Sequence, residues 1–145
     1  AGGGEVAVES SSPVLVLGDE RWLRQLVFNL VDNAVKFAGA KPGDGKRGIV
    51  RLSVWLAGGR GLLSVSDNGP GIPVDKIGHV FERFYRADPA RTLGDQEGSG
   101  LGLSIAAWIA SAHQGEIRVE NREEGGCRFI VGLPLAAASI GRDQQ

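Results

Sequence analysis

The sequence predicts an α/β fold in two layers, with a mixed, mostly antiparallel sheet of about five strands and three helices on one face. Apolar residues recur at helical spacing in residues 19–38 and 101–112, and they alternate with polar residues in residues 50–56. The predicted elements follow the order strands, helix, hairpin, helix, loop, helix and hairpin. This order is typical of helices packed on one side of a mixed sheet.

The first half of the chain begins with short β-prone stretches at residues 6–8 and 14–17. Asp19 is a suitable N-cap for the long helix that follows. This helix carries a stripe of apolar residues that repeats every three to four positions: Leu23, Leu26, Val27, Leu30, Ala34 and Ala38. Residues 50–56 predict a half-buried strand, and a turn at Gly58-Gly59 leads into a second strand over residues 62–67.

The second half starts with a dense turn signal at residues 67–73, after which we expect a short helix over residues 74–85. Residues 86–99 predict a long loop. The next helix ends near Gly115, and two strands, 116–121 and 127–133, close the chain. The predicted apolar stripe of the helix that ends near Gly115 consists of Leu101, Ile105, Trp108 and Ala112.

With 145 residues, 42% of them hydrophobic, the chain can bury one core, so we expect a single domain over residues 1–145. Its core would cover about residues 6–134, with a tail at 135–145. Sixteen basic and seventeen acidic residues give a net charge of −1, which offers no electrostatic case for a nucleic-acid or membrane-surface partner. The single cysteine, Cys127, excludes an internal disulfide and suits a reducing cytoplasm. No apolar run approaches the ~20 residues that span a bilayer.

Four polar or aromatic residues lie along one flank of the long predicted helix, because positions three and four apart share a face. They are Asn29, Asn33, Lys36 and Phe37. Asparagine is a poor helix former, so helix propensity does not explain the two asparagines. Their side-chain carbonyl oxygens are suitable ligands for Mg²⁺, and a lysine supplies a positive charge for phosphate. A solvated helix flank with an ordinary end explains the same residues, so both interpretations stay open.

Asp67 ends an alternating strand on the side of Leu63 and Val65, so its carboxylate points toward the core. A buried carboxylate needs donors, and the exocyclic amine of a purine is one candidate. Gly69 and Gly71 would let the backbone approach such a ring. The alternative is an aspartate that caps its own turn through the amides of the next residues.

The segment Gly98-Ser-Gly-Leu-Gly-Leu-Ser104 opens a helix. Glycine amides beside a helix N-terminus form a concavity for phosphate. The segment is neither a P-loop nor a dinucleotide fingerprint, because no Gly-Lys-Ser/Thr follows and Leu103 holds the last glycine position. A flexible hinge is the alternative.

The segment Phe81-Glu-Arg-Phe-Tyr-Arg86 places two arginines at the start of the long loop. Phe81 and Phe84 are expected to pack. Arg86 could reach a terminal phosphate and stabilise charge during transfer, whereas Arg83 is better explained as a surface residue.

Taken in order, these segments resemble the four sequence boxes of sensor histidine kinase catalytic domains. They read Asn29-Leu-Val-Asp-Asn-Ala-Val-Lys-Phe37, Asp67-Asn-Gly-Pro-Gly-Ile72, Phe81-Glu-Arg-Phe-Tyr-Arg86 and Gly98-Ser-Gly-Leu-Gly-Leu103. Each box alone is weak, but the four in sequence are specific, and the resemblance extends from about residue 15 to 134. It implies the Bergerat (GHKL) fold.

The resemblance also implies roles for individual residues with ATP and Mg²⁺ as cofactors. Asn33 would coordinate Mg²⁺, and Asp67 would accept from the adenine amine. Lys36 and Arg86 would be catalytic through their contacts with phosphate, with residues 87–97 as a lid over the nucleotide. The full nucleotide-binding set is Asn29, Asn33, Lys36, Phe37, Asp67, Gly69, Gly71, Ile72, Arg86, Gly98, Ser99, Gly100, Leu101 and Gly102.

Two departures from the family pattern matter. Family members often carry Ser or Thr near adenine at the position of Cys127, and a thiol is a weaker hydrogen-bonding group. The family's phosphoacceptor is a histidine followed by an acidic residue, whereas His79 and His113 here precede Val80 and Gln114. We therefore expect the phosphoacceptor and sensor domains to lie outside this chain, which alone would be monomeric and would not phosphorylate itself.

The resemblance implies a transferase of bacterial two-component signalling. It would transfer the γ-phosphoryl group of ATP to a histidine on a dimerisation domain of the same protein, with a response regulator downstream. The domain would be cytoplasmic, in a protein anchored in the inner membrane. Two alternatives share the fold: a protein-serine kinase of the anti-sigma type, and an ATP-gated clamp without kinase activity. The pattern of aromatic residues and arginine in residues 81–86 favours the histidine kinase.

Overall fold

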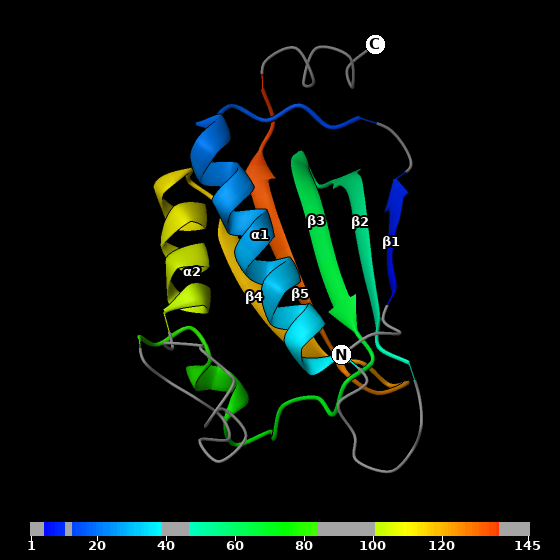
Figure 1. The fold of residues 1–145 in the computed structure, drawn as a ribbon. Coiled ribbons are helices and arrows are strands. Elements are labelled where there is room, and N and C mark those ends of the chain that lie inside the picture. Colours follow the sequence, from blue (N-terminus) through cyan, green and yellow to red (C-terminus); the bar gives the residue numbers. More distant parts are fainter. Residues whose placement is uncertain (1–4, 11–12, 39–46, 84–100, 137–145) are drawn as a thin grey trace.

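The computed structural model describes residues 5–10, 13–38, 47–83 and 101–136. Within them the chain forms a five-stranded sheet with two α-helices on one face (Figure 1). The strand order is β1-β2-β3-β5-β4. β1 runs parallel to β2, and the other neighbouring pairs are antiparallel. The prediction of a two-layer fold with a mixed, mostly antiparallel sheet is confirmed.

The strands are β1 (Glu5–Ser10), β2 (Ile49–Ala57), β3 (Arg60–Asp67), β4 (Glu116–Asn121) and β5 (Cys127–Pro134). Gly58 and Gly59 join β2 to β3 with φ of +61° and +75°, values that favour glycine in a two-residue hairpin turn.

The predicted β-prone stretch at residues 14–17 forms only an isolated bridge, between Val16 and Leu135. Beside it, the Ala136 N–H donates to the Leu15 carbonyl at 2.9 Å. Residues 135 and 136 of the expected tail are therefore held against the segment that precedes α1.

Helix α1 (Glu20–Phe37) begins as the sequence predicts. The Asp19 carboxylate accepts from the backbone N–H groups of Arg21 at 2.9 Å and Trp22 at 3.3 Å, which are among the unpaired donors at a helix start. Leu26, Leu30 and Ala34 are buried against the sheet. The helical spacing of the apolar residues therefore identified the correct face of α1.

Helix α2 (Gly102–Ala112) exists as predicted but presents a different face to the core. Its buried residues are Ala106, Ile109 and Ala110, whereas Ile105 is 37% and Trp108 57% exposed. The predicted stripe is wrong because the helix carries no charged residue, so spacing alone could not tell one apolar side from the other.

The third predicted helix, over residues 74–85, is wrong as an α-helix in its described part. Residues 74–83 form turns around a single 3-10 helix, η1 (Ile77–His79). The N–H of His79 donates to the Lys76 carbonyl at 3.0 Å, a three-residue spacing. Gly78 within the segment lowers its helical propensity.

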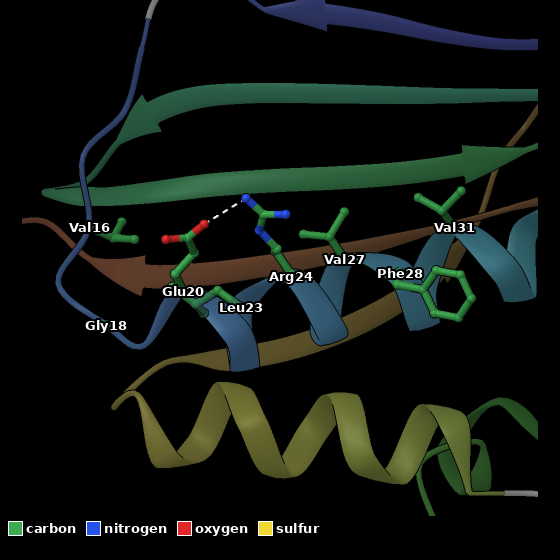
Figure 2. Close-up of a pocket in the computed structure, with 8 residues that line it drawn as sticks. All are labelled: Val16, Gly18, Glu20, Leu23, Arg24, Val27, Phe28 and Val31. Carbon is green, nitrogen blue, oxygen red and sulfur yellow. Dashed lines mark hydrogen bonds and ion pairs between the residues drawn. The ribbon is translucent and has the colours of Figure 1, made fainter.

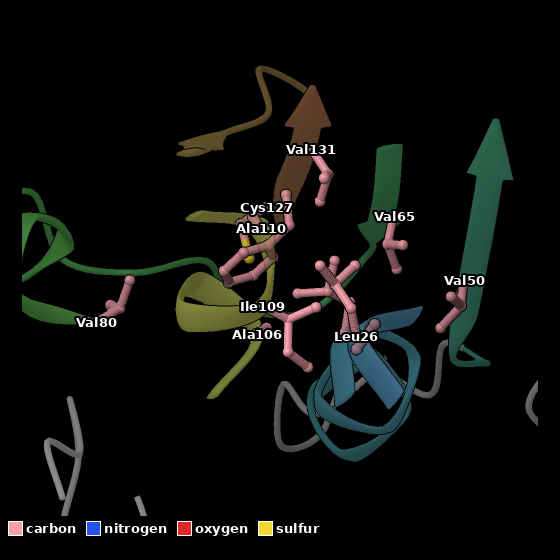
Figure 3. Packing of buried hydrophobic residues seen from close by; sticks show 12 residues of the cluster. Leu26, Val50, Val65, Val80, Ala106, Ile109, Ala110, Cys127 and Val131 are labelled. Carbon is pink, nitrogen blue, oxygen red and sulfur yellow. The ribbon is translucent and has the colours of Figure 1, made fainter. Parts of the chain in front are cut away.

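One hydrophobic core fills the space between the helices and the covered face of the sheet (Figure 3). Phe129 is its largest fully buried side chain, and the ring of Phe81 packs edge-on against it at a centroid distance of 5.9 Å. This confirms the packing expected of Phe81; Phe84 lies outside the described residues. No helix in the described part of the chain is long and apolar enough to cross a membrane.

Candidate nucleotide-binding site

Asp67 ends β3 with its side chain toward the helix layer. In the register of the sheet Asp67 lies opposite Val50, and Val65 on the same face is fully buried. The Asp67 side chain is 2% exposed. Its Oδ1 accepts from the backbone N–H of Gly69 at 2.8 Å. The predicted inward orientation of Asp67 is confirmed. The alternative, in which the aspartate caps its own turn, accounts for the contact of Oδ1 but not for Oδ2.

The second oxygen, Oδ2, accepts from the Sγ of Cys127 at 3.4 Å. Burial raises the pKa of the Cys127 thiol, and the negative charge of Asp67 raises it further, so the thiol keeps its proton and acts as a donor. A thiol donates weakly. Within the described residues no arginine or lysine forms an ion pair with Asp67, so Oδ2 retains capacity for a further donor.

The glycines after Asp67 are explained by packing. A Cβ on Gly69 would lie 2.2 Å from the carbonyl oxygen of Phe37, at the end of α1. Gly71 has φ of +80°, and a Cβ there would lie 2.9 Å from the Oδ1 of Asn121. The absence of side chains thus lets this loop fit against α1 and the β4–β5 hairpin. A contact of either glycine with a purine stays a prediction.

The predicted polar residues of α1 have different surroundings. Asn33 is half-buried, and none of the described residues forms a hydrogen bond with its side chain. Lys36 lies 3.1 Å from the Oδ2 of Asp32. Asn29 donates to the Gly102 carbonyl at 3.1 Å and accepts from Gln25 at 2.7 Å.

These contacts bring three predicted segments to one end of the molecule. Asn29 links α1 to the first residue of α2, and the Phe37 carbonyl packs against Gly69 of the loop after β3. Figure 1 shows the end of α1, the start of α2 and the end of β3 at the same edge. The helix N-terminus at α2 contributes a partial positive charge there. Leu101, which precedes α2, is half-buried, whereas Arg86, Gly98, Ser99 and Gly100 lie outside the described residues.

Two residues of the β4–β5 hairpin that sequence reasoning missed also contact the loop after β3. Asn121 forms two hydrogen bonds with the backbone of Ile72, and Arg122 donates to the carbonyl of Asp67. The signal for Asn121 was present in the sequence. It follows Ile117 and Val119 at alternate positions, so it lies on the same side of the sheet as they do, although its side chain, unlike that of Asp67, is exposed.

Figure 2 shows a groove on the flank of α1 that faces away from α2, with a volume of about 700 Å³. It contains none of the predicted nucleotide-binding residues. The groove is lined by Val16, Gly18, Glu20, Leu23, Arg24, Val27, Phe28 and Val31. It is therefore separate from the site around Asp67, and its apolar lining with one Glu20–Arg24 ion pair offers no cluster of donors for phosphate.

Comparison with known proteins identifies the family to which the chain belongs. Residues 18–137 match the family described as histidine kinase-, DNA gyrase B- and HSP90-like ATPase. The chain belongs to this family. It is 47% identical over 116 residues to the signal transduction histidine-protein kinase AfsQ2 of Streptomyces coelicolor, which is 80% of this chain and 20% of that protein. It is 37% identical over 128 residues to the sensor protein RprX of Bacteroides fragilis, 88% of this chain and 24% of that protein.

Solved structures show the same fold. The mycobacterial sensor histidine kinase MprB aligns with a TM-score of 0.73 and 32% identity over 90% of this chain and 84% of that one. Full-length ShkA, in complex with AMPPNP, aligns with a TM-score of 0.73 and 34% identity over 92% of this chain and 26% of that one. The chain is thus an ATP-binding domain of the sensor histidine kinase type, and it spans only about a fifth to a quarter of the curated relatives named above.

Proposed function

We propose that this domain binds Mg-ATP and, when docked on a helical dimerisation domain of the same protein, positions the γ-phosphoryl group for transfer to a histidine there. The buried carboxylate of Asp67 carries the proposal. Among the described residues its Oδ2 accepts only from the Cys127 thiol, a weak donor, and the adenine amine is a donor that would satisfy it. A response regulator would receive the phosphoryl group downstream.

The described residues fit ATP and a magnesium ion that arrives with it. Among them no group of three His, Cys, Asp or Glu side chains could hold a metal. Mg²⁺ binds proteins through few side chains when phosphate oxygens complete its shell, and the amide oxygen of Asn33 has no partner among the described residues. Bound ATP would supply the phosphoryl group, while the protein contributes orientation and charge.

The other residues of the site would hold the triphosphate. Lys36 carries a positive charge near the end of α1, and Asn29 could exchange its bond to Gly102 for one to phosphate. Arg86, outside the described residues, is the candidate for contact with the γ-phosphate. Replacing Arg86 by alanine should slow transfer and leave ADP affinity nearly unchanged. A large loss of ADP affinity would contradict that role.

Two experiments test the proposal. Calorimetry of the domain with ATP, with and without Mg²⁺, tests binding. Incubation with ATP and the dimerisation domain of the full-length protein then tests transfer, and an acid-labile phosphoprotein supports histidine as the acceptor. An acid-stable product would identify a serine kinase instead. ATP-driven dimerisation in sedimentation without any phosphoprotein would identify a clamp.

Because ATP is a cytoplasmic substrate, we place the domain on the cytoplasmic side. The full-length protein would be anchored in the inner membrane. Fractionation of cells that express the full-length protein, followed by protease treatment of spheroplasts, tests this location. Cleavage of the domain in intact spheroplasts would contradict it.

A further inference from the structure

The turn of the β4–β5 hairpin holds both ends of the loop that carries Asp67. At one end, the Oδ1 of Asn121 accepts from the Ile72 N–H at 2.9 Å, and its Nδ2 donates to the Ile72 carbonyl at 2.7 Å. A side-chain amide has a donor and an acceptor in one plane, as a peptide group has. The paired bonds therefore fix both the position and the orientation of the Ile72 backbone.

At the other end, the Nη1 of Arg122 donates to the Asp67 carbonyl at 2.7 Å. The side chain of Arg122 is only 16% exposed, and its second amino group lies 3.3 Å from Glu124. The same carbonyl also touches Gly126, where a Cβ would lie 1.9 Å from its oxygen. The peptide that follows the Asp67 side chain is thus held against the hairpin by a hydrogen bond and by close packing.

The opposite side of the loop is attached to the start of β2. The Oδ1 of Asn68 accepts from the Ile49 N–H at 2.9 Å, and its Nδ2 donates to the Arg47 carbonyl at 2.8 Å. This attachment holds Asn68, the residue that directly follows Asp67, and does not reach Ile72. Only the hairpin, among the described elements, forms hydrogen bonds with both Asp67 and Ile72.

We propose that Asn121 and Arg122 are positioning residues that aim the Asp67 carboxylate at the adenine ring. The inference rests on the proposed function, because it assumes that Asp67 accepts from the adenine amine. A carboxylate accepts a hydrogen bond from an amine only within a narrow range of donor–acceptor distance and angle, since hydrogen bonds weaken steeply with misalignment. Loss of either residue would let the loop shift and would weaken base recognition while the phosphate-binding residues of α1 stay in place.

The test compares ATP dissociation constants, measured by calorimetry, for the wild-type domain and five variants. Asn121→Ala and Arg122→Ala should each raise Kd about tenfold, as expected for the loss of one or two hydrogen bonds. Arg122→Lys keeps a donor for the Asp67 carbonyl and should recover most of the affinity. Val119→Ala, a half-buried residue on the same strand with no bond to the loop, controls for general destabilisation.

Hydrogen exchange of the ligand-free protein gives a second readout. The Ile72 amide should exchange faster in Asn121→Ala, and it should keep its protection in Val119→Ala. Wild-type affinity in Asn121→Ala and Arg122→Ala would overturn the proposal, as would an equal loss of affinity in Val119→Ala. If Asn121→Ala does not fold, Arg122→Ala decides the question.

The fifth variant, Asp67→Asn, separates this inference from the proposed function. If the wild type binds ATP and Asp67→Asn does not, whereas the hairpin variants bind normally, only the positioning role fails. If Asp67→Asn binds ATP as the wild type does, the adenine contact itself is wrong.

Discussion

The exchange of Asp67 for asparagine replaces one carboxylate oxygen by an amino group in a side chain that is 2% exposed. The new amide oxygen can keep the bond from the Gly69 N–H, which is 2.8 Å in the wild type. The amino group then faces the Cys127 thiol and, in the complex, the adenine amine. Three hydrogen-bond donors, the asparagine amide, the thiol and the adenine amine, would then face one another where the wild-type protein has a carboxylate oxygen that accepts.

The magnitude follows from these contacts. A hydrogen bond to a charged group contributes about 1.5–3 kcal/mol, and an unsatisfied buried donor costs about 1–3 kcal/mol. Because the site is buried, solvent does not relieve either term. Together they predict a loss of roughly 2.5–6 kcal/mol, which is about a 10²- to 10⁴-fold rise in the Kd for ATP.

Calorimetry with ATP and ADP measures this change, and circular dichroism checks that the fold is retained. The exposed Asp75, exchanged for asparagine, is a matched control, because the chemistry is the same and the carboxylate is in solvent. A Kd within threefold of the wild-type value in Asp67→Asn would refute the assignment of the adenine acceptor.

Three further predictions concern the metal, the loop and the thiol. Asn33→Ala should weaken ATP binding about tenfold in the presence of Mg²⁺ and much less with EDTA, and equal losses in calorimetry would exclude a metal role. Gly69→Ala should lower the free energy of unfolding by about 3 kcal/mol in urea titrations, because its Cβ would meet the Phe37 carbonyl, whereas Gly78→Ala, with nothing within 4 Å of its Cβ, should not. The Cys127 thiol has a raised pKa in the folded protein, so above its ordinary value of 9.0 the unfolded chain releases a proton that the fold retains. Stability should therefore fall by about 1.4 kcal/mol per pH unit in the wild type relative to Cys127→Ser, and parallel pH profiles would contradict the raised pKa.

The sequence predicted α1 and the hairpins well because local signals agree there. The Asp19 cap, the stripe through Leu26 and Leu30, and the Gly58-Gly59 turn each depend on neighbours along the chain. The direction of the Asp67 side chain was also predictable, since alternation along a strand fixes which side faces the core. These features need no knowledge of what lies opposite.

Features that depend on a distant partner were decided only in the tertiary structure. The buried side of α2 is the one that meets the sheet, and eleven residues without a charge could not reveal it. The hydrogen bonds between Asn121 and Ile72 connect residues that are 49 positions apart in the sequence. The packing of Gly69 against the Phe37 carbonyl connects the loop after β3 to the end of α1. Local patterning therefore determined the elements and the inward direction of Asp67, whereas contacts between elements decided how Asp67 and its loop are held, because such contacts depend on geometry that no short stretch of sequence contains.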